Sequence, residues 1–218
     1  MPRAFTAVEK ETIRSKLMSA GRECFLRYGL KKTTIEDLTK PAGIAKASFY
    51  LFFESKEKLF IEVFMEEIPA MMTRLTEASF GATEDTREAL ILLMKGIVRE
   101  MEENAMARIM MDDPSEIERI ASVIDYEDIL QQVAPTFAPM LSAIAEAQAR
   151  GEIIGGDPFL ISYSLGLVKM LAFNRDRIPQ PLYQQMVDLA PQIIADGLTC
   201  PARGMASRPS DGANEAAS

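Results

Sequence analysis

The stretch "TTIEDLTKPAGIAKASFYLFFESKEKLF", residues 33 to 60, contains two short helical segments joined by a glycine turn. Thr34 is a favourable N-cap residue, and Asp37 follows three positions later in a weaker form of the capping box. Gly43 predicts the turn that ends the first segment, and residues 45 to 52 predict a second, short helix. A helix, a short turn with glycine and a second helix together are typical of a helix-turn-helix.

The short second helix is predicted to have two chemically different faces. At about 100° per residue, Phe49, Phe52 and Phe53 gather on one side, where they can pack against the preceding helices. The opposite side carries Lys46, Ala47, Tyr50 and Leu51, with Ser48 on its flank. Cationic and hydroxyl groups can contact phosphates or base edges, and small apolar groups can contact thymine methyl groups. We therefore expect this side to enter the major groove of DNA.

Two helix starts in the stretch favour phosphate binding. Thr33 and Thr34 precede one helix, and Lys56 follows the Ser55 N-cap of another, where helix N-termini attract anions. The predicted DNA-binding residues are Thr33, Thr34, Lys46, Ala47, Ser48, Tyr50, Leu51 and Lys56. The structural alternative is a helical hairpin within a core, with its surface lysines solvated.

The charge distribution supports a nucleic-acid partner for the N-terminal part of the chain. The first 60 residues hold 12 Lys and Arg against 7 Asp and Glu, although the whole chain carries a net charge of −8. The remaining residues hold 12 basic and 25 acidic side chains. A basic head on an acidic body fits a polyanion-binding module joined to a domain with another role.

The same residues resemble the DNA-binding signature of the TetR family of bacterial transcriptional regulators. The matching features are the threonine pair, Leu38, Ala42-Gly43-Ile44, Ser48-Phe49-Tyr50, Phe53, Ser55-Lys56-Glu57 and Leu59-Phe60. Ala45 departs from the family pattern because a serine N-cap is common there, and Leu51 and Phe52 replace groups that form hydrogen bonds. The resemblance implies an Ω-shaped homodimer with N-terminal DNA-binding domains, helical effector-binding domains and a four-helix dimer interface.

The whole chain is predicted to be all-α, with about nine helices and no convincing strand pattern. We expect a helix-turn-helix DNA-binding domain over residues 1–54 and a larger effector-binding and dimerisation domain over residues 55–200. One helix is expected to run from Ser55 toward residue 80 and so to join the two domains. Residues 201–218 are rich in Pro, Gly, Ser and Ala, which predicts a disordered tail.

A cluster of methionines suggests where the larger domain holds a ligand. Eight of the 14 methionines lie between Met65 and Met111, and methionine adapts to irregular apolar shapes. In the resembled family this region helps to line the effector pocket, which implies a small apolar effector. The predicted pocket residues are Phe64, Met94, Met101, Met110, Tyr126 and Phe137. Ordinary core packing is the alternative explanation of the methionines.

Two apolar segments near the C-terminus are candidates for the dimer interface. Residues 158–173 are apolar almost all round, which predicts a helix covered on several sides. Residues 181–198 could supply the second helix, and the predicted interface residues are Leu160, Leu167, Leu171, Leu182, Met186, Leu189 and Ile193. The alternative is a pair of core helices in a monomer.

Composition argues against catalysis and against a metal site. The chain has no histidine, which removes most zinc sites and the usual serine or cysteine nucleophile systems. Adjacent acidic pairs such as Glu102 and Glu103 point apart on a helix. We therefore expect no enzyme activity, no cofactor and no metal. The charged start of the chain and the lack of a long apolar segment predict a cytoplasmic protein without a signal peptide or membrane span.

These features together predict a transcriptional repressor. It would bind a palindromic double-stranded DNA operator as a homodimer and be released by a small apolar effector. Two alternatives remain at this point. One is a helix-turn-helix protein controlled by a partner protein without a small ligand, and the other is a helical enzyme.

Overall fold

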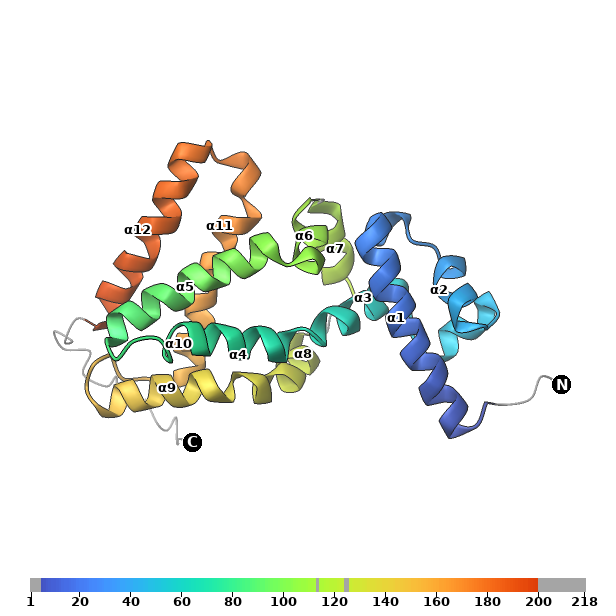
Figure 1. Ribbon diagram of the computed structural model, residues 1–218, viewed down its shortest axis with the longest axis horizontal. Helices are drawn as coiled ribbons and strands as arrows, with labels where there is room; N and C mark the ends of the chain where they lie inside the picture. Colours follow the sequence, from blue (N-terminus) through green and yellow to red (C-terminus); the bar gives the residue numbers. More distant parts are fainter. Residues whose placement is uncertain (1–4, 113, 124–125, 200–218) are drawn as a thin grey trace, which may run out of the picture.

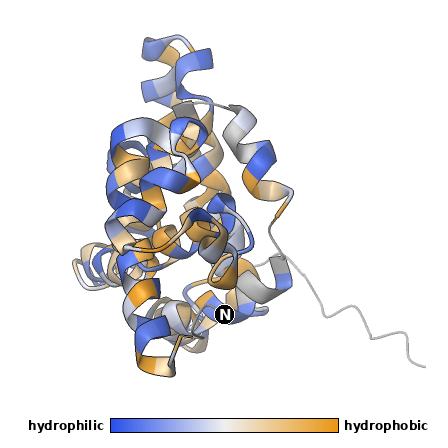
Figure 2. Ribbon diagram, turned by 90° about the vertical axis from the view of Figure 1, so that its right-hand side faces the viewer, coloured by the Kyte–Doolittle hydropathy of each residue, from blue (hydrophilic) through white to orange (hydrophobic). Residues whose placement is uncertain are grey.

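The computed structural model describes residues 5–112, 114–123 and 126–199, and the predicted tail lies outside these ranges. Within them the chain forms helices, turns and no strand, so the all-α prediction is confirmed. A small N-terminal unit lies at one end of the molecule and a larger helical body at the other (Figure 1). Hydrophilic and hydrophobic residues alternate along the helices in Figure 2, as expected for helices with one buried face.

The N-terminal unit consists of α1 (Ala7–Lys32), α2 (Ile35–Ala42), the 3₁₀ helix η1 (Lys46–Leu51) and α3 (Lys56–Met65). Helix α1 begins at a capping box, in which Thr6 and Glu9 each bond the other's backbone N–H. Its last turn is set off by Gly29, whose φ of +75° is unfavourable for residues with a side chain. The helix is therefore kinked at Gly29. The core of this unit buries Leu17, Phe25, Leu30, Leu38, Phe49, Leu59 and Phe60.

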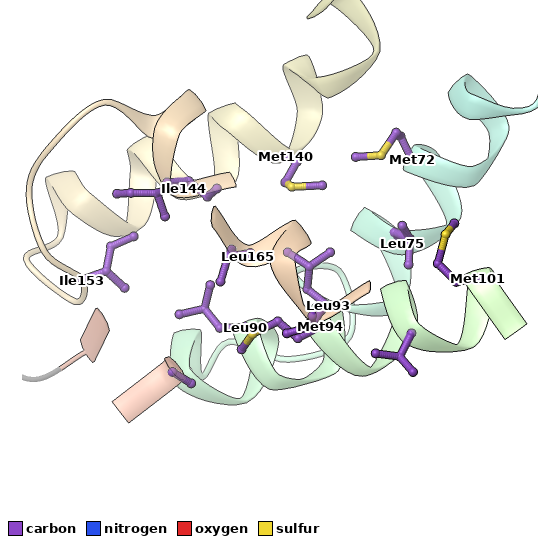
Figure 3. Close-up of a cluster of buried hydrophobic side chains, with 14 of the residues drawn as sticks. Met72, Leu75, Leu90, Leu93, Met94, Met101, Met140, Ile144, Ile153 and Leu165 are labelled. Atoms are coloured by element: carbon purple, nitrogen blue, oxygen red, sulfur yellow. The ribbon is translucent and has the colours of Figure 1, made fainter. Parts of the chain in front are cut away.

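The larger body is built around α5 (Thr86–Glu103), which contacts α4, α11 and α12. The other helices are α4 (Ile68–Ala78), α6 (Ala105–Asp112), α7 (Pro114–Ala121), α8 (Tyr126–Val133), α9 (Ala138–Ala149), α10 (Pro158–Leu165), α11 (Lys169–Phe173) and α12 (Gln180–Thr199). Short 3₁₀ turns lie at Ala134–Phe137, Gly166–Val168 and Arg175–Arg177. Figure 3 shows Leu90, Leu93 and Met94 of α5 among side chains from α4, α9 and α10.

The helix expected to run from Ser55 toward residue 80 is interrupted, which corrects that prediction. Helix α3 ends at Met65, Glu66 and Glu67 form a turn, and α4 begins at Ile68 with Pro69 in its first turn. Proline has no backbone N–H to donate, so it suits the first turn of a new helix and disfavours the interior of a continuous one. The connection between the N-terminal unit and the body therefore contains a turn at residues 66–67.

Helix α3 belongs to the cores of both parts of the molecule. Its residues Leu59, Phe60 and Val63 are buried with the N-terminal unit. Phe64, one position further along, packs against the cores of both the N-terminal unit and the body. Met106 of α6 also joins the N-terminal core. A movement of α3 would therefore displace residues in the cores of both the N-terminal unit and the body, because close-packed interiors transmit displacement.

Candidate nucleic-acid interface and ligand cavity

The first helix of the helix-turn-helix is capped by the residues that the sequence predicted. The Thr34 hydroxyl accepts from the Asp37 backbone N–H at 3.3 Å, and the Asp37 carboxylate accepts from the Thr34 N–H at 2.9 Å. The Thr34 hydroxyl also donates to that carboxylate at 2.7 Å. Hydrogen bonds from Thr34 keep the pKa of Asp37 below its ordinary value. Thr34 is exposed at this helix start, where a phosphate could approach it.

The turn between the two helices depends on Gly43. Its φ of +73° lies in the left-handed region, and its N–H donates to the Lys40 carbonyl at 3.2 Å. The Ile44 N–H donates to the Thr39 carbonyl at 3.2 Å, which closes the end of α2. Glycine is the usual residue in this conformation because it has no Cβ. The turn sets the angle at which the next helix leaves α2.

The second helix, η1, is a 3₁₀ helix with one anchored and one exposed side. Ala45, at its start, provides no side-chain cap. Phe49 is fully buried and its ring lies 5.8 Å from that of Phe53, which is also buried. Tyr50 and Leu51 are 56% and 68% exposed. Lys46 and Ala47 are exposed with them, while Ser48 and Phe52 are half-buried. The two-sided arrangement predicted for this segment is thus present.

Lys46 is not isolated on the exposed side. Its ammonium donates to the Glu36 carboxylate of α2 at 2.8 Å. This hydrogen bond lowers the pKa of Glu36 and raises that of Lys46. Both groups are well exposed, so solvent and salt weaken their attraction. Sequence reasoning missed Glu36 because its partner lies ten residues away on the other side of the turn.

Two residues predicted to contact phosphate have hydrogen-bond partners within the chain. Thr33 is buried, and its hydroxyl donates to the Gly29 carbonyl at 2.7 Å. The Lys56 ammonium donates to the carbonyls of Leu30, Lys31 and Thr33 at 2.6, 3.1 and 2.9 Å. An ammonium has three N–H groups, and these carbonyls engage all of them. Both side chains thus stabilise the end of α1 in the DNA-free chain, and their contacts with phosphate remain a prediction.

A polar junction joins the N-terminal unit to the interhelical turn at residues 66–67. Arg22 of α1 forms an ion pair with Glu67 and donates to the Val63 carbonyl at 3.3 Å. Glu67 also accepts from the side-chain amide of Asn104 at 2.7 Å. The Asn104 side-chain oxygen in turn accepts from the Ala107 N–H at 2.9 Å, at the start of α6. These side-chain contacts thus connect α1, the α3–α4 turn and the α5–α6 turn in series.

The body contains an apolar cavity of about 360 Å³. Its walls come mainly from α3, α4, α5, α10 and α11, with single residues from α6, α7, α8 and α9 and from two 3₁₀ turns. Of the predicted pocket residues, Phe64, Met101, Met110 and Phe137 line it. Met94 does not, because it is fully buried in the core beside Leu90 and Leu93 (Figure 3). The Tyr126 side chain lies outside the described part of the structure.

Methionines that the prediction did not single out as pocket residues contribute much of the remaining lining. They are Met65, Met71, Met72 and Met140. Polar atoms are few, and the carboxylate of Glu100 is held by Arg74 through two hydrogen bonds of 3.1 and 3.0 Å. The buried Ser162 hydroxyl lies 3.1 Å from the Met140 sulfur. This lining suits a largely apolar ligand, for which protein pockets of about 300–1,000 Å³ are usual.

Exposed apolar side chains recur along α10, the 3₁₀ turn at Gly166–Val168, α11 and α12, and together they are called the exposed row. Leu160 and Leu167 are 63% and 60% exposed, and Leu182, Leu189 and Ile193 are between 50% and 60% exposed. Tyr163 and Met170, which were not predicted, are also exposed on this part of the chain. Leu171 and Met186 are half-buried. Large exposed apolar patches mark interaction sites in soluble proteins.

The inner side of α12 is fixed by a tyrosine. Tyr183 is buried, and its hydroxyl donates to the Glu102 carboxylate of α5 at 2.7 Å. Burial, reinforced by this carboxylate, raises the pKa of Tyr183. Tyr183 and its contact with α5 therefore orient α12 so that Leu182, Leu189 and Ile193 face outward. Among the described residues, no cluster of acidic or cysteine side chains could hold a metal ion, and no helix is both long and apolar enough to cross a membrane.

These features define a helix-turn-helix unit joined to a helical body that contains an apolar cavity. A sequence model described as "Bacterial regulatory proteins, tetR family" matches residues 17–63, which contain the helix-turn-helix. The chain has the fold of a TetR-family transcriptional regulator from Pectobacterium atrosepticum, with a TM-score of 0.68 and 20% identity. That likeness covers 91% of this chain and 100% of the other. The N-terminal helix-turn-helix thus matches the tetR family of bacterial regulatory proteins, and the whole chain shares the fold of a solved member of that family.

Two curated relatives match part of the chain in sequence. The chain is 30% identical over 82 residues to the "Uncharacterized HTH-type transcriptional regulator YhgD" of Bacillus subtilis, across 36% of this chain and 43% of that protein. It is 26% identical over 110 residues to the "Probable acrEF/envCD operon repressor" of Escherichia coli, across 48% and 50%. The chain spans about half the length of the curated relatives it matches.

Proposed function

We propose that this protein is a cytoplasmic transcriptional repressor that binds a palindromic operator as a homodimer and is released by a small, largely apolar effector. The observation that carries the proposal is the exposed side of η1, where Tyr50 and Leu51 project above the buried Phe49. A rigidly anchored short helix with hydroxyl, cationic and apolar groups on its outer side suits major-groove recognition. Thr34, Lys46, Ala47 and Ser48 are proposed to contribute further contacts. The relative described as an operon repressor supports repression as the mode of regulation.

The exposed row on α10 to α12 supports the dimer. Leu160, Leu167 and Leu189 would each be buried against a second copy of the chain, and apolar burial stabilises by about 25 cal/mol per Å². A twofold interface uses the same patch on both copies. It would place two η1 helices on one face of a duplex, about 34–36 Å apart.

The position of the cavity supports control by a ligand. Phe60 lines the cavity and also belongs to the N-terminal core, where its ring lies 5.3 Å from that of Phe25. A ligand that fills the cavity therefore presses on a residue shared with the DNA-binding unit. If the ligand prefers one position of α3, it shifts the population toward that state and changes DNA affinity. A cavity of this kind favours small-ligand control over control by a partner protein alone.

Selection of bound fragments from random DNA tests the proposal. The expected result is a palindrome whose half-sites are about one helical turn apart. Fluorescence anisotropy with the selected duplex then measures affinity with and without candidate apolar compounds. A single asymmetric site bound by one chain would overturn the dimeric readout. Equal affinity for selected and scrambled duplexes would overturn the assignment of η1 as a recognition helix.

A further inference from the structure

Three aromatic rings and a lysine form a row along the cavity. The ring centres of Phe137 and Phe159 are 6.4 Å apart, and those of Phe159 and Tyr163 are 6.3 Å apart in a stacked orientation. The Lys169 ammonium lies over the Tyr163 ring, 5.8 Å from its centre. All four residues line the cavity. The row therefore leads from an apolar aromatic surface to a positive charge.

The charge of Lys169 is not balanced within the cavity. Glu100, the other charged lining residue, already has Arg74 as its partner. In the part of the chain that the structure describes, Lys169 forms no ion pair, and its recorded contact is with the Tyr163 ring. A cation beside an apolar surface loses solvation when a ligand covers it, and an opposite charge on that ligand compensates for the loss. A neutral or cationic ligand would leave Lys169 without such compensation.

We propose that the cavity binds an amphipathic carboxylate, whose apolar body lies along Phe137, Phe159 and Tyr163 and whose anionic group pairs with Lys169. The inference rests on the proposed function for the ligand's regulatory role, but the binding itself does not require DNA. A charge-assisted hydrogen bond from the ammonium to a carboxylate is stronger than one between neutral groups. Lys169 thus selects acids over neutral molecules of the same shape, while the aromatic row and methionines accept varied apolar bodies.

Isothermal titration calorimetry on the DNA-free protein tests this assignment with two matched pairs of probes. 1-Naphthoate is compared with 1-naphthamide, and octanoate with octan-1-ol. At least one acid is expected to bind about tenfold more tightly than its neutral partner, from the usual strength of hydrogen bonds to charged groups. Lys169→Met should remove that preference and leave the affinity for the neutral compound within about twofold.

Two further variants separate a loss of recognition from a loss of fold. Lys169→Arg keeps the charge and should retain most of the preference, whereas Lys95→Met changes the charge elsewhere in the same domain and should leave it intact. Circular dichroism checks that each variant is folded. No binding of either acid, or an acid preference that survives in Lys169→Met, would overturn the inference. If an acid binds through Lys169 without changing DNA affinity, the ligand class stands and the proposed effector mechanism fails.

Discussion

The Lys46 ammonium lies 2.8 Å from a carboxylate oxygen of Glu36, across the turn of the helix-turn-helix. The two side chains are 57% and 61% exposed, so the pair adds little to stability. The pair matters for DNA recognition, because Glu36 is bonded to Lys46, a cation on the side of η1 proposed to face DNA. The lowered pKa of Glu36 keeps this negative charge in place even below the ordinary pKa of a glutamate.

Glu36→Gln is expected to tighten DNA binding about two- to fivefold at low salt, in line with the strength of exposed ion pairs. The substitution removes a charge that repels phosphate and releases Lys46 from its ion pair. Fluorescence anisotropy at two salt concentrations measures the effect, which should shrink as screening increases. Glu23→Gln, an equal charge change on α1, is the control and should produce a smaller gain. Weaker binding by Glu36→Gln would mean that the pair is needed to position Lys46.

Tyr50→Ala and Leu51→Ala are expected to affect DNA binding differently. The Tyr50 hydroxyl is proposed to contact a phosphate, so its loss should weaken binding to all duplexes alike. Leu51 is proposed to contact thymine methyl groups, so its loss should mainly change the preferred sequence, by about 1–3 kcal/mol at one base pair. Affinities for the selected duplex and for single-base variants give the comparison. Equal losses for Leu51→Ala on specific and nonspecific DNA would contradict this assignment.

The parts of the helix-turn-helix that depend on near neighbours could be predicted from sequence. Thr34 caps its helix through Asp37, only three residues away, and Gly43 follows directly after α2. The partners of Lys56 could not be predicted, because the Leu30 carbonyl lies 26 residues earlier and meets it only after folding. Lysine after an N-cap is equally suited to phosphate or to a carbonyl cluster, and residue type alone does not choose between them.

The larger domain shows the same division between local and tertiary information. The exposed apolar side chains of α12, at Leu182, Leu189 and Ile193, follow a helical spacing that is visible in the sequence. Met94 and Met101 both follow such a spacing on α5, yet only Met101 lines the cavity. Which of the two methionines lines the cavity depends on the helices that pack against each part of α5. The break before α4 did have a local signal in Pro69, which favours the start of a helix.

Lys56→Met is expected to lower the free energy of unfolding by about 1–3 kcal/mol, because three carbonyls near the end of α1 lose a charged donor. Urea unfolding followed by circular dichroism measures this loss. Lys58→Met, two positions along the same helix, is the matched control and should change stability by less than about 0.5 kcal/mol. A stable Lys56→Met variant with a reduced salt dependence of DNA binding would instead restore the phosphate role expected from the sequence.

Leu189→Glu is expected to convert the proposed dimer to a monomer, because it places a charge in the middle of the exposed apolar row. Leu189 is 55% exposed in the single chain, so the substitution should leave the fold of the monomer intact. Sedimentation velocity measures the assembly state, and DNA affinity should fall with it. Val8→Glu replaces another exposed apolar residue, 76% exposed on α1, and should remain dimeric. An unchanged sedimentation coefficient for Leu189→Glu would place the interface elsewhere.

Arg22→Met is expected to loosen the N-terminal unit without unfolding the body. Arg22 pairs with Glu67 and also bonds the Val63 carbonyl, so its loss removes the polar contacts between α1 and the α3–α4 turn. Local opening of α1 and α2 should become about fivefold or more frequent, because hydrogen bonds to charged groups contribute about 1.5–3 kcal/mol each. Hydrogen–deuterium exchange resolved by peptide measures this change and should show α5 and α12 unaffected.

The control for that experiment is Arg74→Met, which breaks an arginine–glutamate pair within the body, between α4 and α5. It should leave exchange in α1 and α2 at the wild-type rate. Faster exchange throughout the molecule in Arg22→Met would mean that the two parts unfold as one unit. Unchanged exchange in α1 would mean that apolar packing around Phe60 alone joins them. The expected local effect would identify Arg22 and Glu67 as the contact through which a displaced α3–α4 turn reaches the DNA-binding unit.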